Sequence, residues 1–312
     1  MTAAGQPDKA RHVCSSFHGV WDRSLQPALE VEDGEILELH VPDASREQIG
    51  EHAVVGDLAS IDFDLMNPVA GPVFVRGARP GDVLEVEVLE VRTRAWGWTA
   101  IVPGFGLLAD DFPEPWLRIS RIEEGRVFFG ERFQLPSRPF PGTIGVAPES
   151  PGPHSVIPPS RFGGNIDVRH LTAGATLFLP VGIEGALFSA GDGHAAQGDG
   201  EVCGSAIETG MEIALRLGVR RDIRVDAPQL LVPAMSPVAE GRVHVTTGVA
   251  EDLHEAARGA ARAMIERLSG LGLGPEEAYA LLSVAGDLRI HEIVNAPRWV
   301  VGMALPEAVL AS

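Results

Sequence analysis

The sequence predicts a mainly β fold, with sandwich-like or barrel-like sheets and a helical, α+β addition near the C-terminus. Alternating apolar and polar residues over 83–91 follow a turn-forming Pro80-Gly81-Asp82, which indicates a strand with one solvated face. Similar apolar runs separated by turn-forming residues occur on both sides of it. Helical spacing of apolar residues begins only after residue 250. These observations together favour sheets first and helices last.

In the N-terminal half, we expect strands where short apolar runs are bounded by turn residues. These segments are 36–41, 61–65, 73–75 and 83–91. In the last, Leu84 and Val86 should share one face and Glu85 should lie on the other. Residues 103–165 are rich in proline and glycine, so we expect either loops over a binding site or short strands packed at a seam.

The C-terminal half should continue with strands over 177–219, to which 223–245 adds more, and then two helices. A first helix is predicted over 251–268 from its helical apolar spacing. A second should follow Gly274, because proline at position 275 suits the first helical turn. The chain divides into a β-rich region, 1–170, and a β-rich region with helices, 171–312, either separate or integrated into one domain.

Composition limits the function. The net charge of −18 argues against binding to nucleic acid or to an anionic membrane surface, and it suits a small neutral or cationic ligand. Lys9 is the only lysine, which makes amide-cleaving mechanisms that need a buried lysine improbable. With two cysteines and no apolar run of membrane-spanning length, we expect a cytoplasmic protein with reduced thiols.

The most informative segment is 191–201, Gly-Asp-Gly-His-Ala-Ala-Gln-Gly-Asp-Gly-Glu, which follows an apolar run. It brings Asp192, His194, Asp199 and Glu201 close together on a backbone that four glycines allow to turn. Carboxylates with one imidazole are suitable ligands for a divalent metal. The alternative is an acidic surface turn, since aspartate and glycine are common turn residues.

Several segments in a consistent order resemble the acetamidase/formamidase family, from about residue 18 to residue 305. They are Trp21-Asp22, 67–72, 75–82, 142–148, 162–167, 191–201 and 282–290. Asn67 and Phe162 depart from this pattern, because relatives often have histidine at both positions. The resemblance implies a β-rich fold with C-terminal helices, hydrolysis of small amides to carboxylate and ammonia, and a bound divalent metal.

For such chemistry, a metal-activated water is the expected nucleophile, and Zn²⁺ is the expected ion, with Ca²⁺ as an alternative. We expect His194 and Asp192 to be metal ligands. The missing ligand should come from elsewhere in the fold, and Asp64 and Asp43 at predicted strand ends are candidates, though each also suits a turn.

Glu201 is the preferred general base, which would later give its proton to the departing nitrogen. Asp199 is also a catalytic candidate that could exchange roles with Glu201, or else cap a turn. In a second cluster, Gly164 and Asp167 are expected to bind substrate and Asn165 to take part in catalysis, because glycine N–H groups and a carboxamide suit an oxyanion. The alternative is an ordinary turn.

The sequence therefore predicts a metal-dependent amidohydrolase for a small aliphatic amide, formamide or acetamide, acting as a homodimer. A nucleophilic Cys203 is disfavoured, because its surroundings read as an apolar strand and no lysine accompanies it. Two rivals remain open. One is a non-catalytic β-rich binding protein with a structural metal, and the other is a hydrolase of larger or cyclic amides.

Overall fold

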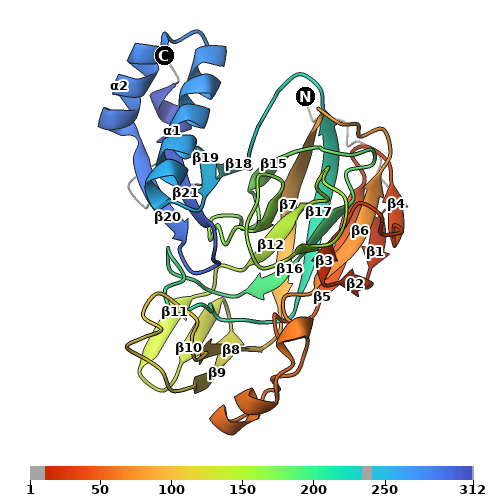
Figure 1. The fold of residues 1–312 in the computed structure, drawn as a ribbon, viewed down its shortest axis with the longest axis vertical. Coiled ribbons are helices and arrows are strands. Elements are labelled where there is room, and N and C mark those ends of the chain that lie inside the picture. The colour runs from red at the N-terminus through yellow and green to blue at the C-terminus, as the bar shows by residue number, and fades with distance from the viewer. Residues whose placement is uncertain (1–10, 234–240, 311–312) are drawn as a thin grey trace.

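The computed structural model describes residues 11–233 and 241–310. Several β-sheets form the body of the molecule, and two α-helices lie together at one end of it (Figure 1). The predicted mainly β fold with C-terminal helices is confirmed. None of the helices in this described part of the chain has the length and apolar character that a membrane span requires.

The largest sheet has nine strands and draws them from both halves of the chain. In spatial order they are β1 (Arg11–Cys14), β5 (Ile36–Val41), β17 (Met211–Arg220), β7 (Val83–Thr93), β15 (Thr176–Pro180), β18 (Gln229–Val232), β19 (Val243–Ala250), β21 (Trp299–Pro306) and β20 (Asp287–Glu292). In β7, Leu84 and Val86 are fully buried and Glu85 is partly exposed, as the alternation predicts.

A six-stranded sheet carries the strands that build the functional site. Its order is β14 (Gly163–Asn165), β12 (Phe140–Val146), β16 (Phe188–His194), β6 (Val69–Val75) and β2 (Phe17–His18), and β4 (Leu29–Val31) also pairs with β6. One continuous apolar core joins the two sheets, with Leu39 and Val86 from the first and Ile144 and Phe188 from the second. Burial of this core is the main stabilising contribution to the fold.

The proline-rich and glycine-rich middle of the chain contains both short strands and loops. A four-stranded sheet is formed by β8 (Trp96–Ile101), β9 (Trp116–Glu123), β10 (Arg126–Phe129) and β11 (Phe133–Pro136), and β3 (Val20–Trp21) pairs with β13 (His154–Ser155). The strand predicted over 61–65 is wrong. Those residues lead into the 3-10 helix η2 (Phe63–Leu65), because the Asp62 carboxylate accepts the Asp64 N–H and stabilises a turn. Another 3-10 helix, η1 (Val55–Ser60), precedes it.

Both predicted helices are present. Helix α1 (Leu253–Gly270) begins where the Asp252 carboxylate accepts the Glu255 N–H, and α2 (Pro275–Ala285) begins at the proline. The short η3 (Glu307–Val309) ends the described chain. Helix α1 packs so closely against Gly248 of β19 that an added Cβ there would overlap the Ala256 carbonyl oxygen. Glycine is therefore required at this contact.

Candidate active site

The end of β16 places Asp192 and His194 on one face of the six-stranded sheet, where both are buried. They are two residues apart, so the period of the strand directs them the same way. On the neighbouring strand β12, a Cβ on Gly142 would lie 2.4 Å from Asp167 Oδ1, 2.7 Å from Asp192 Oδ2 and 2.7 Å from His194 Cε1. Glycine at this position keeps open a space bounded by ionisable side chains.

The His194 imidazole is at the centre of this cluster. Its Nε2 lies 3.2 Å from Glu208 Oε2, 3.3 Å from Asp192 Oδ1 and 3.8 Å from Glu201 Oε1. Its Nδ1 lies 3.8 Å from Asp167 Oδ1. Ligand atoms within 4.8 Å of one another form two groups that share the histidine, Asp192–His194–Glu208 and Asp167–His194–Glu201. Both groups have the donor types that hold a divalent cation.

Gln197 determines which ring nitrogen of His194 carries the proton. Its Oε1 lies 2.8 Å from His194 Nδ1, and its Nε2 donates to the Asp167 carbonyl oxygen at 3.0 Å. Since an amide oxygen only accepts hydrogen bonds, we assign the proton to Nδ1. In the neutral ring, the Nε2 lone pair then points towards Asp192 and Glu208, as a metal-binding histidine requires.

Burial of several carboxyl groups in one place shifts their protonation. Burial, together with the neighbouring acids, raises the pKa of Asp167 to about 8 and that of Glu208 to about 7. Burial and the Asp167 charge also raise the pKa of Glu201 well above its ordinary value. For His194, burial lowers the pKa, but the charges of Glu208 and Asp192 outweigh it and raise the pKa well above the ordinary value. Burial in one cluster therefore opposes full ionisation of these acids at neutral pH, and a cation among them would favour it.

The residues present suit a divalent metal. Three buried atoms, His194 Nε2, Glu208 Oε2 and Asp167 Oδ1, have no hydrogen-bond partner among the described residues. Buried polar atoms are rarely left in that state, and a bound ion is one ordinary explanation. Asp167 Oδ1 and the His194 ring border the space that Gly142 keeps open, and Glu208 Oε2 lies 3.2 Å from His194 Nε2. Imidazole with carboxylates favours Zn²⁺ over Ca²⁺, which prefers six to eight oxygens.

A cavity of about 450 Å³ leads to these residues. Its polar lining includes Asn165, Asp192, Glu201, Glu208 and Asn295. Its apolar lining includes Phe63, Met66, Trp98, Val102 and Phe105. A concave, mostly apolar pocket with a few converging polar groups is the usual form of a small-molecule site. The predicted residues Asn165, Asp167, Asp192, His194 and Glu201 are thus brought together at or beside one cavity.

Asp199 is not brought into this cluster. Its side chain is 31% exposed, and its Oδ2 lies 3.3 Å from Arg289 Nη1, with Arg169 and His170 near its other oxygen. Asp199 therefore forms ion pairs outside the cluster, in place of the predicted catalytic role or turn cap. Loop 195–201 turns between Gln197 and Glu201, so these two face the site while Asp199 points to the arginines.

Two further expectations differ from the structure. Asp64 is exposed on η2 and belongs to none of the candidate metal groups of the described chain. Gly164 lies in β14 but lines a separate hollow beside Pro158 and Arg298 rather than the cavity of Glu201. Asp43, the other candidate ligand, is buried, and its Oδ1 accepts hydrogen bonds from the Ser45 hydroxyl and N–H, which stabilises a turn.

The segment after Glu201 is also not the predicted apolar strand. It forms turns, in which the Cys203 thiol donates to the Ser205 carbonyl oxygen. The segment returns Glu208 to the site through a bridge with His194. Glu208 was missed by the sequence analysis, although one signal was present, since it is the only charged residue between 202 and 211. Such an isolated carboxylate in an apolar run is unusual unless it is paired.

Asn295 was also missed, and nothing in its local sequence indicates a role. Its Nδ2 donates to Asp167 Oδ2 at 2.6 Å, and its N–H donates to Glu292 Oε2 at 2.8 Å. Asn67, one of the two departures from the family pattern, places its Nδ2 3.4 Å from Asp192 Oδ2. Both carboxamides therefore hold carboxylates of the cluster in position.

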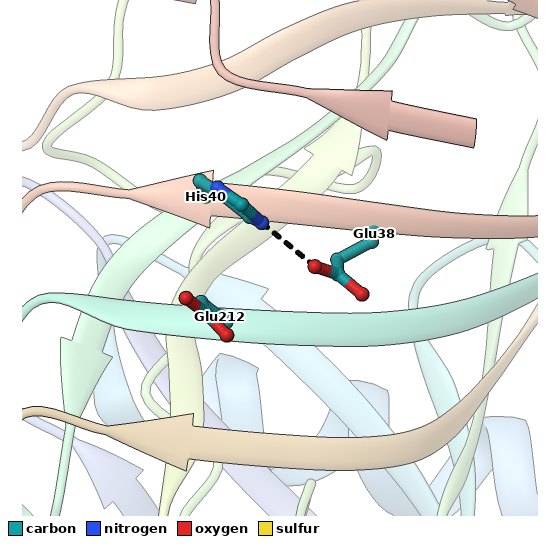
Figure 2. Close-up of side chains that lie close together, drawn as sticks. All are labelled: Glu38, His40 and Glu212. Carbon is teal, nitrogen blue, oxygen red and sulfur yellow. Dashed lines mark hydrogen bonds and ion pairs between the residues drawn. The ribbon is translucent and has the colours of Figure 1, made fainter. Parts of the chain in front are cut away.

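A third candidate metal group lies elsewhere, on the largest sheet. Figure 2 shows Glu38 and His40 on β5 beside Glu212 on β17, with His40 Nε2 2.7 Å from Glu38 Oε1. Here guanidinium groups already neutralise the carboxylates, because Arg11 pairs with Glu38 and Arg92 pairs with Glu212 at 2.7 Å. Fixed positive charges this close disfavour a cation. The arrangement is better explained as a surface ion-pair network.

The raised pKa of the buried acid Glu292 can be tested through the pH dependence of protein stability. Burial raises its pKa from 4.5 to about 7, so the folded state keeps this proton at pH values where the unfolded state has lost it. Stability should therefore fall as pH rises from about 4.5 to 7, on the order of 3 kcal/mol at about 1.4 kcal/mol per pKa unit. In Glu292→Gln, the free energy of unfolding in urea should lose this part of the decrease between pH 5 and pH 8. The exposed Glu51→Gln serves as control, and an unchanged pH dependence in Glu292→Gln would contradict the assignment.

Comparison with known proteins identifies the family of the chain. A profile of the acetamidase/formamidase family matches residues 6–156 and 152–312. The formamidase of Methylophilus methylotrophus is 26% identical over 94% of this chain and 89% of its own, and the acetamidase of Mycolicibacterium smegmatis is 27% identical over 86% and 85%. The crystal structure of an acetamidase from Bacillus halodurans superposes with a TM-score of 0.88 and 32% identity, over 97% of this chain and 99% of that one. The chain belongs to the acetamidase/formamidase family.

Proposed function

We propose that this amidase hydrolyses a neutral linear amide to a carboxylate and ammonia in the cavity above His194, with a divalent metal, Zn²⁺ in first place. The observation that supports this most directly is the convergence of several buried carboxyl groups on the one imidazole of His194, beside the space left by Gly142. The names of the relatives, formamidase and acetamidase, support the amide as substrate. Cytoplasmic location and a homodimer stay predictions from the sequence.

Nε2 of His194 and the carboxylates of Asp192 and Glu208 would hold the metal. Bound there, a divalent ion would polarise the amide carbonyl and lower the pKa of a water molecule from about 15.7 towards 7. Gln197 keeps the imidazole in the tautomer that this requires. Asp167 is hydrogen-bonded by Asn295 and would contribute a further carboxylate.

Glu201 is suited to the proton transfers. It is buried and lines the cavity, and burial with the Asp167 charge raises its pKa well above the ordinary value, which favours return of a proton once it has been accepted. It would take the proton of the attacking water and deliver it to the amide nitrogen as the carbon–nitrogen bond breaks. Without that proton, the nitrogen would have to leave as an amide anion.

Asn165 is suited to hold the substrate carbonyl. Thr143 Oγ1 donates to Asn165 Oδ1 at 2.6 Å, so the amide nitrogen of Asn165 is the group turned to donate elsewhere. A donor placed where negative charge develops on the carbonyl oxygen stabilises the transition state. Asn165 lines the same cavity as Glu201, as this role needs.

The experiment is ammonia release from formamide and acetamide by protein of known metal content, before and after dialysis against a chelator. We expect the chelated protein to lose activity and Zn²⁺ to restore it, since two buried ligand groups share one histidine. A sample dialysed without chelator is the control. Undiminished turnover after complete metal removal would contradict the metal. Retained Ca²⁺ without any ammonia release would instead favour the binding-protein alternative.

A further inference from the structure

A second cavity of about 470 Å³ adjoins the one that contains the site. The two share Phe63, Met66, Trp98, Val102 and Pro103 in their walls, so they lie side by side. Beyond the shared wall, every lining residue of the second cavity is apolar or glycine. The cavity that holds Asp192, Glu201 and Glu208 thus has a neighbouring space with an apolar wall.

The walls of this second cavity come from separate parts of the chain. Leu58 and Ala59 of η1 form one side, and Ala100 of β8 forms another. Val55 and Phe63, also in its lining, are 45% and 56% exposed. Large apolar side chains exposed beside a ligand cavity commonly mark a surface that a ligand covers. Formamide and acetamide are much smaller than either cavity.

We propose that the substrate is a primary amide with an extended apolar acyl group, such as a medium-chain aliphatic or aryl group, which occupies the second cavity. The inference rests on the proposed hydrolysis, with the carboxamide at Asp192, Glu201 and Glu208. Because that reaction releases ammonia, the amide nitrogen carries only hydrogen, and the apolar group must be on the acyl side. Cavities of about 300–1,000 Å³ bury ligands much larger than acetamide.

The test is kcat/KM for the series formamide, acetamide, butyramide, hexanamide and phenylacetamide, measured by ammonia release with the metal-loaded protein. We expect hexanamide to exceed acetamide by at least about tenfold, since even one methylene in a hydrophobic pocket is worth about 10–200-fold. A series in which formamide or acetamide is the best substrate would overturn the proposal while leaving amide hydrolysis intact.

Two variants place bulk in the second cavity without altering the lining of the first, Ala100→Leu and Ala59→Leu. The ratio of kcat/KM for hexanamide to that for acetamide should fall about tenfold in each. Ala59 is exposed, so its variant should fold even if leucine at the buried position 100 overpacks the core. Ala280→Leu, on an exposed position of α2, is the matched control and should leave the ratio unchanged. An unchanged ratio in both cavity variants would overturn the assignment.

Calorimetric binding separates this inference from the proposed function. If no amide releases ammonia, the proposed hydrolysis fails, and binding then decides on the cavity alone. Hexanamide that binds more tightly than acetamide, and less tightly to Ala59→Leu than to Ala280→Leu, would uphold the apolar subsite. Equal affinity for the two amides would overturn it.

Discussion

The variant His194→Ala is expected to lose the bound divalent metal and at least about a hundredfold in kcat/KM for amide hydrolysis. Even residues that only orient a metal ligand cost about 10–100-fold when changed, and His194 is itself common to both candidate ligand groups. Its removal also leaves Asp192, Glu208, Glu201 and Asp167 together without the imidazole that links them. Zinc content by elemental analysis and ammonia release are the two measurements.

His254→Ala is the control for this variant, because His254 is exposed on α1 and belongs to neither group. It should keep both the metal and the activity. A His194→Ala protein with full zinc content and near-normal turnover would show that the ligand set proposed around His194 is wrong. Retained zinc with lost turnover would instead assign the imidazole to substrate or proton transfer.

Glu201→Gln is expected to lower kcat by about 10²–10⁴ while the metal content stays the same, because a carboxamide cannot accept and return a proton. The pH profile should change as well. A general base acts in its ionised form, so activity of the parent protein should rise with pH through the raised pKa of Glu201. That rise should be absent from the residual activity of the variant.

Asp199→Asn distinguishes the two acids that the sequence left interchangeable. Asp199 pairs with Arg289 outside the cavity, so its amide should have little effect on kcat. If Asp199→Asn lost activity as severely as Glu201→Gln, or if Glu201→Gln remained fully active, the role of Glu201 as base would be refuted.

Local patterns were enough for most of the secondary structure. The alternation in β7 and the apolar spacing of α1 each follow from contacts within one element and one neighbouring face. The error over 61–65 has a local cause too, since the Asp62 side chain competes for a backbone N–H and closes a turn where an apolar run suggested a strand. The turns after Glu201 interrupt an apolar run in the same way. There the Cys203 thiol donates to the Ser205 carbonyl oxygen, and the Glu208 carboxylate accepts the Ala206 N–H.

The loop 191–201 was recognisable because its glycines and ionisable residues are adjacent in sequence. The sequence did not show which of the acids in this loop face the site. Asp199 and Glu201 are two residues apart, yet the turn directs one to arginines and the other to His194. Once the backbone leaves a regular strand, the sequence no longer indicates the direction in which a side chain points.

By itself, the sequence determined the mainly β fold with C-terminal helices, because that depends on local periodicity, and the family, because its motifs follow one another in order along the chain. It also predicted a site at Asp192 and His194, which are close in the chain. Only the tertiary structure decided which distant groups join them. Glu208 reaches His194 through an isolated bridge, Asp167 is held by Asn295, and Gly142 leaves the space between them. These contacts depend on how strands from distant parts of the chain pair and pack, and such long-range register leaves no local periodicity for a sequence to display.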